Sequence, residues 1–397
     1  MACELGKAIR QKEFYHSEDY GFTNHGAWGT VPRRVLDVQK RYLEEVEQNV
    51  DHWFRRSSDK YVNAAKQAAA DFLGANVANI NFVENATRGL NSILKSIPLS
   101  PGDAILATNF TYNAVANACR AASAKSQGTE VVAFNITFPI SSREAFIKNY
   151  TDFLDAHKNI KVAVIDVISS FPSMLLPWKE LTAACRERGI LACLDGAHVP
   201  GQLRIALEEC GADFFVGNLH KWSFCPRGCA VIWVHQAHHH LVRPTVTSHI
   251  YDKKQPFPGD FDLQGTRDLT AYACVPDAIK FYHDIAGGWD EVLAHNCSLV
   301  ERFTEDLVNA FGTSQLQIPV DMRSPFMRHV KLPELPGWQG TQDDAIKLMN
   351  TLYEKGVLAA VECIEDELWL RISAHVYNTP EDYERLKSVV LEMAEIK

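Results

Sequence analysis

The sequence lacks several features that would assign it to a common protein class. No apolar run reaches the roughly 18 residues of a membrane-spanning helix. Only 10 of the 397 residues are cysteine, and they are scattered, which excludes a disulfide-stabilised scaffold. Long basic runs are absent, and the net charge is -9, which argues against nucleic-acid or anionic-membrane partners. The first fifteen residues are charged and have no apolar core, so we expect no secretory signal and a cytoplasmic protein.

Common catalytic and metal-binding motifs are absent as well. The sequence contains no G-x-S-x-G, H-E-x-x-H, P-loop or G-x-G-x-x-G motif. Cys225 and Cys229 are close together but lack a second pair at zinc-site spacing. The run 238–240 consists of three histidines, which point in different directions if they lie on a helix, so a solvated surface is the simpler interpretation. We therefore predict no metal site.

What is present is the pattern of an α/β protein. Between residues 80 and 234, short apolar runs alternate with amphipathic ones; residues 87–97, for example, place apolar side chains at helical spacing. The strands expected from this pattern are 80–83, 104–107, 130–134, 162–165, 190–194, 213–216 and 230–234. Because many of them are almost continuously apolar, we predict a mostly parallel sheet covered by helices on both faces.

The two ends of the chain follow a different pattern. Pro32 opens an amphipathic helix, and Gly287-Gly288 interrupts the chain after a short helix that starts at Pro276. A helix, a strand, a helix, a strand and a final helix follow, the last one with a capping box at Thr379 and Asp382. We predict a large domain over 31–275 and a small α+β domain over 276–397, with residues 1–30 joining the small domain and edging the pocket.

Polar residues follow three of the predicted strands at the point where each strand ends. Asp166 leads to Ser170, Asp195 leads to His198, and a third strand leads through Asn218 to Lys221. Because ligands of parallel sheets bind at the carboxyl ends of the strands, we expect these side chains to meet in one crevice.

A carboxylate and a lysine in one crevice suit pyridoxal phosphate. The lysine amine binds the cofactor's aldehyde, and the carboxylate keeps the pyridine nitrogen protonated. The segment Asn85-Ala86-Thr87, after a predicted strand, offers a helix start for the phosphate. Taken alone, Asp195 has a plainer explanation as a helix cap, and Lys221 as a solvated side chain. The combination, in this order along the chain, favours the cofactor.

Four segments carry a family resemblance: Asp195-Gly196-Ala197-His198, Asn218-Leu219-His220-Lys221-Trp222, Gly265-Thr266-Arg267-Asp268, and Arg371-Ile372-Ser373 followed by Tyr377-Asn378. They resemble the class V aminotransferases, which are fold-type I pyridoxal-phosphate enzymes. The resemblance extends from Asn24 to the last helix, and is strongest to the branch of isopenicillin N epimerases and cysteine desulfhydrases. It implies a mostly parallel seven-stranded sheet between helices and a smaller α+β C-terminal domain.

The resemblance also implies roles for individual residues. Lys221 matches the lysine that binds the cofactor and then moves protons, Asp195 the partner of the ring nitrogen, and Tyr112 the aromatic residue stacked on the ring. His198 and Ser170 match positions beside the phenolic oxygen. The matched phosphate contacts are Ala86, Thr87, Asn218 and His220. Thr266 matches a phosphate contact from the partner subunit, which implies a homodimer with shared active sites.

The substrate side of the pocket follows from the same resemblance. Arg371 matches the arginine that holds the substrate carboxylate, and Asn24 and His25 match the segment at the pocket edge. Cysteine desulfurases carry a nucleophilic cysteine on a loop before this arginine. Here that segment is short and Cys363 lies among acidic residues, so we interpret Cys363 as structural.

The resemblance to the cysteine desulfhydrase branch implies a reaction at cysteine. We predict a C–S β-lyase that acts on L-cysteine, an S-substituted cysteine or its sulfoxide and yields pyruvate, ammonia and a sulfide or thiol. An epimerase or racemase of the isopenicillin N type and an aminotransferase remain open, because these reactions differ only in the placement of acids and bases. A non-catalytic protein that binds the cofactor is a further alternative.

Overall fold

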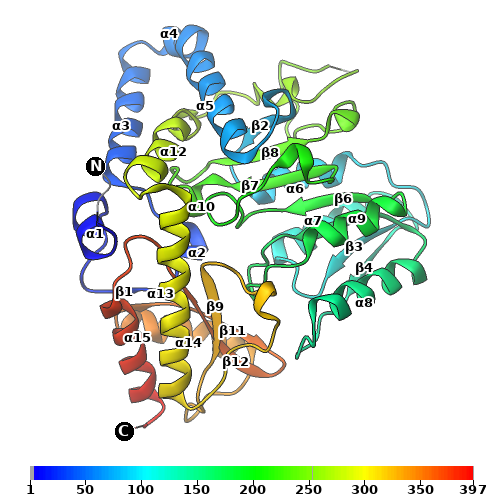
Figure 1. Cartoon of the computed structure of the whole chain (residues 1–397). Coiled ribbons are helices and arrows are strands. Elements are labelled where there is room, and N and C mark those ends of the chain that lie inside the picture. Colours follow the sequence, from blue (N-terminus) through cyan, green and yellow to red (C-terminus); the bar gives the residue numbers. More distant parts are fainter. Residues whose placement is uncertain (1–3, 253, 397) are drawn as a thin grey trace.

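The computed structural model describes residues 4–252 and 254–396 and is built around a seven-stranded sheet (Figure 1). Its strand order is β2-β8-β7-β6-β5-β3-β4. These strands are β2 Ile80–Val83, β3 Ala104–Thr108, β4 Glu130–Phe134, β5 Ile160–Asp166, β6 Leu191–Asp195, β7 Phe214–Asn218 and β8 Ala230–Val234. Strand β8 runs antiparallel to both neighbours, and the other pairs are parallel. The predicted mostly parallel seven-stranded sheet is confirmed.

Helices cover both faces of this sheet, because successive strand residues alternate between two apolar cores. Val164 lies in a core with helices α6 and α7, whereas the next residue, Ile165, lies in a core with α5, α8 and α9. The helices of the structure are α1 Lys7–Glu13, α2 His25–Trp28, α3 Arg33–Gln48, α4 Val50–His52, α5 Ser58–Leu73, α6 Ala86–Ser96, α7 Asn113–Ser123, α8 Arg143–Ala156, α9 Trp178–Glu187, α10 Leu219–Trp222, α11 Thr270–Ala273, α12 Val275–Asp284, α13 Gly288–Phe311, α14 Gln342–Glu354 and α15 Pro380–Met393. None of the helices in the described residues is both long and apolar enough to cross a membrane.

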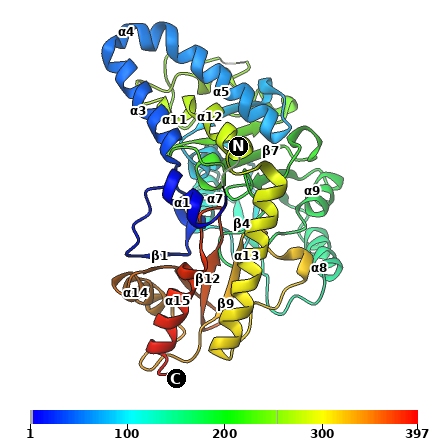
Figure 2. The same cartoon turned by 60° about the vertical axis from the view of Figure 1, so that its left-hand side comes forward.

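A second, smaller sheet forms near the C-terminus. Strands β11 (Ala360–Ile364), β12 (Glu367–Ser373) and β9 (Met327–Lys331) form an antiparallel sheet against α13 and α14. Near it, β10 (Val357–Leu358) pairs with β1 (Gly21–Phe22) of the N-terminal segment, and Figure 2 shows β1 beside α14 and α15. The domain boundaries at residues 30 and 275 stay predictions. Helix α12, just beyond the second boundary, packs against α3 and α5.

Strand β11 was not expected from the sequence. Only two of its five residues, Val361 and Ile364, are buried, so it lacks the alternation that marks a strand. A tight turn joins it to β12 at Glu365 and Asp366, both of which have positive φ. Cys363 lies on this hairpin, where its Sγ donates to the Gly340 carbonyl at 3.0 Å. It is absent from the walls of the large-sheet cavity described below.

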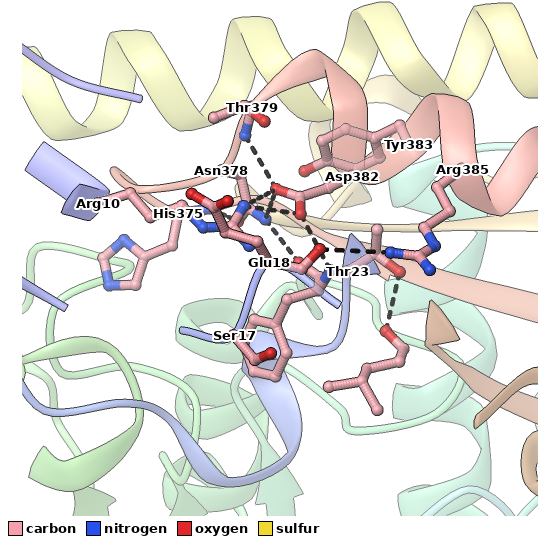
Figure 3. A network of polar contacts seen from close by, with 12 residues as sticks. Arg10, Ser17, Glu18, Thr23, His375, Asn378, Thr379, Asp382, Tyr383 and Arg385 are labelled. Carbon is pink, nitrogen blue, oxygen red and sulfur yellow. Dashed lines mark hydrogen bonds and ion pairs between the residues drawn. The ribbon is translucent and has the colours of Figure 1, made fainter. Parts of the chain in front are cut away.

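The N-terminal segment is fastened to α15 through Asp382, which is 2 % exposed (Figure 3). Arg10 Nη1 donates to both carboxylate oxygens, at 2.8 and 2.9 Å. The backbone N–H groups of Phe22 and Thr379 and the side-chain amide of Asn378 also donate to this carboxylate, at 3.0 to 3.1 Å. The predicted capping box of this helix is confirmed. A single buried charge therefore joins the two ends of the chain.

We expect Asp382→Ala to lower the free energy of unfolding by about 3 kcal/mol, because it leaves the Arg10 guanidinium and several N–H donors without a partner. The measurement is urea unfolding at neutral pH. Asp306→Ala is the matched control: Asp306 pairs with Lys387 on the surface and is 39% exposed, so its loss should cost less than about 1 kcal/mol. Equal losses in the two variants would contradict a special contribution of the Asp382 network.

The pH dependence of stability should reflect His16. Its ring lies 4.7 Å from that of Phe22 and 4.2 Å from that of Tyr377, and its Nε2 has no partner among the described residues. Burial, assisted by the charge of Arg10, lowers the pKa of His16 to about 4. Below the ordinary pKa of about 6.5, His16 therefore binds a proton in the unfolded chain but not in the folded chain. The free energy of unfolding consequently decreases as the pH falls from 6.5 towards 4.

His16→Phe should remove this part of the acid sensitivity while keeping an aromatic ring in place. Relative to the wild type, the variant should gain about 1.4 kcal/mol of unfolding free energy between about pH 8 and about pH 5.5. Urea unfolding of both proteins at the two pH values measures this difference. If the two proteins lose stability in parallel, His16 is not the group responsible.

Candidate active site

A cavity of about 340 Å³ opens at the carboxyl ends of the central strands of the large sheet. It is lined by nine of the residues predicted from the sequence, namely Ala86, Thr87, Tyr112, Ser170, Asp195, His198, Asn218, His220 and Lys221. The structure thus brings together side chains from five separate segments. Asp166, which was expected in this crevice without a role of its own, also lines the cavity, as do Trp28, Glu84 and Arg227, which were not predicted from the sequence. In the part of the chain that the structure describes, no group of three or more His, Cys, Asp or Glu side chains is arranged to bind a metal ion.

Lys221 lies on α10, directly after β7, and its Nζ is 2.9 Å from His198 Nε2. The indole N–H of Trp222 donates to His198 Nδ1 at 3.2 Å, so a neutral His198 carries its proton on Nε2. That proton points at the lysine nitrogen and needs an amine lone pair to accept it. Burial, with a contribution from the charge of Arg371, lowers the pKa of Lys221 to about 7. Its surroundings therefore favour the nucleophilic, uncharged amine.

Two buried carboxyl groups lie next to each other below the lysine. Asp166 and Asp195 end the adjacent parallel strands β5 and β6 in register, and they are 3 % and 4 % exposed. The backbone N–H of Ala197 donates to Asp195 at 3.0 Å, and the Thr111 hydroxyl donates to Asp166 at 3.3 Å. Burial raises the pKa of both groups, and the charge of Asp195 raises that of Asp166 further. Because two adjacent buried charges are costly, we assign the single negative charge to Asp195, whose carboxylate is stabilised by the hydrogen bond from the Ala197 N–H.

The N-terminus of α6 forms the opposite end of the cavity. Asn85 caps this helix by accepting from the Arg88 N–H at 2.9 Å, and the Ala86 N–H donates to Asn218 Oδ1 at 2.9 Å. Thr87 adds its hydroxyl to the lining. The first turn of a helix has unpaired N–H groups and a positive dipole end, which together attract anions. The exposed Arg227 adds a positive charge to the same cavity.

Arg371 lies on β12 of the small sheet and contacts Ser170, a residue of the cavity wall, without lining the cavity itself. Its Nη1 donates to the Ser170 carbonyl at 2.8 Å, and its Nη2 donates to Asn24 Oδ1 at 2.9 Å. Arg371 is 5% exposed, and its Nε has no partner among the described residues. Burial lowers the pKa of Arg371 to about 10, which still leaves the guanidinium charged at neutral pH. A buried, charged guanidinium with an unused N–H is suited to a carboxylate.

Of three further residues predicted from the sequence, Tyr112 lines the cavity, whereas His25 and Thr266 do not. Tyr112 caps α7 and is 52 % exposed at the cavity mouth, where its predicted stacking on a ring stays a prediction. His25 is fully buried and does not line the cavity. Its ring nitrogen Nε2 is hydrogen-bonded to the backbone carbonyl oxygen of Lys221. Thr266 lies on an exposed loop outside the cavity walls, so its predicted contact with a partner subunit's cofactor also stays a prediction.

The position of Asp166 at the crevice could be predicted from the sequence, but its pairing with Asp195 could not. Asp166 stands at the end of a strand, like Asp195, and the strand pattern was recognised. The missing information was the register of β5 on β6, which brings the two carboxyl groups to the same level. Trp28, at the end of the four-residue helix α2, and Arg227, between α10 and β8, had no comparable signal, because single exposed residues in such short segments follow no pattern.

Comparison with known proteins gives a consistent assignment. The sequence profile of the family "Aminotransferase class-V" matches residues 25–386. The L-cysteine desulfhydrase of Arabidopsis thaliana is 27% identical over 424 residues, which cover 99% of this chain and 92% of the relative. The isopenicillin N epimerase of Amycolatopsis lactamdurans is 25% identical, covering 94% of this chain and 94% of the relative.

Solved structures share the fold. The cystine C–S lyase C-DES in complex with its reaction product cysteine persulfide has a TM-score of 0.80 at 18% identity, covering 95% of this chain and 98% of that one. A C-DES mutant with glycine covalently linked to the PLP cofactor has a TM-score of 0.80 at 17% identity, covering 95% and 97%. The family profile spans the cavity and both sheets described above. The chain therefore belongs to the aminotransferase class-V family.

Proposed function

We propose that this protein is a pyridoxal-phosphate-dependent C–S β-lyase that acts on L-cysteine or an S-substituted cysteine. The observation that carries the proposal is the arrangement around one cavity of an amine with a pKa near 7, a buried carboxylate and a buried guanidinium. The choice of a lyase is supported by relatives named L-cysteine desulfhydrase and by the shared fold of a cystine C–S lyase.

The residues of the cavity fit the cofactor. The N-terminus of α6, with Thr87 and Asn218, would hold the phosphate. Asp195 would pair with the ring nitrogen and Lys221 with the aldehyde, while Tyr112 at the mouth would cover the ring. The unpartnered Nε of the buried Arg371 is independent evidence of a ligand, because a buried guanidinium N–H without a partner is costly. Arg371 would take the carboxylate of the amino acid.

Pyridoxal phosphate, when bound, withdraws electrons from the substrate α-carbon. The chain's own residues then determine which proton moves. Lys221 Nζ, held in its uncharged form beside His198, would take the α-proton and return a proton to the departing sulfur. Arg371 would fix the substrate by its carboxylate and so direct the α-hydrogen towards that amine. Loss of the thiol leaves 2-aminoacrylate, whose hydrolysis gives pyruvate and ammonia.

The test is a substrate panel. The purified full chain, loaded with pyridoxal phosphate, receives L-cysteine, L-cystine, S-alkyl cysteines and their sulfoxides. Pyruvate is measured together with the sulfur compound that each releases, which is sulfide, a persulfide, a thiol and a sulfenic acid, respectively. Pyruvate formed in equal amount to the released sulfur compound supports the lyase. Deuterium from solvent at the α-carbon of recovered substrate, without pyruvate, would replace the lyase by an epimerase. A sulfur-containing 2-oxo acid would replace it by an aminotransferase.

We further propose that two copies of the chain share their active sites, with Thr266 reaching the cavity of the other copy. Large apolar side chains are exposed in the segment just before it, at Val246, Ile250, Tyr251 and Leu263. Such a group of exposed apolar residues is typical of a protein interface. Light scattering on the purified chain should give twice the 44.5 kDa mass of one chain. The cytoplasmic location stays a prediction.

A further inference from the structure

His25 links Tyr377, which follows strand β12 of the small sheet, to the backbone of Lys221. The imidazole is fully buried, with Nε2 2.5 Å from the Lys221 carbonyl oxygen and Nδ1 2.7 Å from the Tyr377 hydroxyl. Helix α2, which carries His25, packs on α10, which carries Lys221 (Figure 1). His25 does not line the cavity, and the substrate contact expected for it from the sequence stays a prediction.

The hydrogen bonds fix the direction of this link. A carbonyl oxygen can only accept, so His25 Nε2 carries the proton and donates it to Lys221. Nδ1 is then the acceptor, and the Tyr377 hydroxyl donates to it. Burial lowers the pKa of His25 to about 3 and raises that of Tyr377, so both groups keep these roles across the neutral range. The Tyr377 hydroxyl therefore selects the one tautomer that can hold the lysine's carbonyl.

The backbone leaves little freedom at this contact. A Cβ at Gly29 would lie 2.0 Å from the His220 carbonyl oxygen, and one at Gly26 would lie 2.7 Å from Met327 Sδ. The absence of a side chain at Gly29 lets the end of α2 approach the backbone of α10, and the absence of one at Gly26 leaves room for Met327 of β9. His25, directly before Gly26 and one helical turn before Gly29, is thus held at a fixed height against the lysine's peptide group.

We infer that His25 is a positioning residue for Lys221, holding the lysine's carbonyl so that Nζ stays beside His198. Tyr377 orients His25 and follows the strand that carries Arg371, while Ser373 on that strand bonds back to Thr23 through its N–H at 2.8 Å. Hydrogen bonds and strand β12 therefore connect Arg371, which is proposed to bind the substrate carboxylate, with His25, which holds the backbone of Lys221. The effect that we expect of His25 on turnover rests on the proposed function, whereas its effect on the reactivity of the Lys221 amine does not.

Four variants test this inference. His25→Leu removes both hydrogen bonds. His25→Gln keeps an amide N–H for the Lys221 carbonyl and an amide oxygen for Tyr377, so it should rescue the position. Tyr377→Phe leaves the imidazole but removes the hydroxyl that orients it. This variant replaces His25→Leu in the test if His25→Leu does not fold. His239→Leu is the matched control, because His239 is also buried and bonded through Nε2 to a backbone carbonyl, that of Val234 at 3.1 Å, away from the cavity.

The first readout is the reactivity of the Lys221 amine. The full chain is treated with hydroxylamine to free the lysine, labelled by reductive methylation at a series of pH values, and analysed by peptide mass spectrometry. The wild type should reach half reactivity near pH 7. Because a displaced amine that is only partly hydrated regains part of its ordinary basicity, His25→Leu should be labelled about tenfold less at that pH, and Tyr377→Phe should be intermediate. His25→Gln and His239→Leu should match the wild type.

The second readout is the kinetics of the holoenzyme. His25→Leu should lower kcat about tenfold and change KM less than twofold, since the carboxylate site is retained. Unchanged labelling in both His25→Leu and Tyr377→Phe would overturn the inference, as would an equal shift in His239→Leu. If the wild type turns over no substrate, the proposed function fails, and the labelling profile still decides the role of His25.

Discussion

Lys221→Ala should lower pyruvate formation by about 10³-fold or more while leaving the fold intact. The variant removes the nitrogen that lies 2.9 Å from His198 Nε2 and that we assign both to covalent cofactor binding and to proton transfer. General acid–base catalysis by a positioned group contributes about 10² to 10⁴ in rate, and the covalent attachment adds to that loss. In the wild type, borohydride treatment should leave the cofactor attached to the peptide that contains Lys221.

The matched control is Lys387→Ala. Lys387 is a partly buried lysine of α15 that is bound to Asp306 and Glu384, outside the cavity. It should keep wild-type turnover and wild-type borohydride labelling. Turnover of Lys221→Ala within a factor of ten of the wild type would overturn the assignment of the lysine. Labelling at another lysine would have the same meaning.

Arg371→Lys should lower kcat/KM for amino-acid substrates by about 100-fold, mainly through KM. The substitution keeps a positive charge but loses the planar fork that holds Ser170 and Asn24 at once and leaves Nε for a carboxylate. A charge-assisted hydrogen bond contributes about 1.5 to 3 kcal/mol, and each 1.4 kcal/mol corresponds to a tenfold change. Cofactor affinity should change less than twofold, because none of the hydrogen bonds of Arg371 goes to the residues proposed to hold the phosphate, the ring nitrogen or the aldehyde.

Arg328→Lys provides the comparison for this variant. Arg328 lies in the same small sheet and is 12% exposed, but its guanidinium binds Glu301 instead of facing the cavity. It should reduce stability without the loss in kcat/KM. An S-substituted cysteamine, which lacks the carboxylate, should bind wild type and Arg371→Lys equally well in competition experiments. Equal kcat/KM for the wild type and Arg371→Lys would remove Arg371 from the substrate site.

The parts of the fold that the sequence predicted are those set by local pattern. Strands β7 and β8 of the large sheet are almost continuously apolar, and the start of α15 has a complete capping box, so periodicity and capping were sufficient. The pattern failed at β11, where only two residues are buried and the strand depends on pairing with β12. Local sequence carries no information about such pairing.

The same distinction applies to the site. Asp195 and Lys221 could be predicted because each stands at a strand end and parallel strands end at one edge of a sheet. The contacts of His25 could not, because its partners Lys221 and Tyr377 are 196 and 352 residues away along the chain. The pairing of Asp166 with Asp195 depends in the same way on strand register.

The hydrogen bond between Asn24 and Arg371 has a consequence for biosynthesis. The strands of the large sheet are all encoded before residue 235, so a nascent chain holds the lysine and the carboxylate pair early. Domains generally fold in order from the N-terminus during synthesis. Arg371, whose guanidinium is proposed to bind the substrate, is synthesised much later, and its Nη2 donates to Asn24 near the start of the chain. On this basis a ribosome-bound chain could take up a cofactor before it could recognise an amino acid, and its chemistry would begin only after Arg371 has emerged.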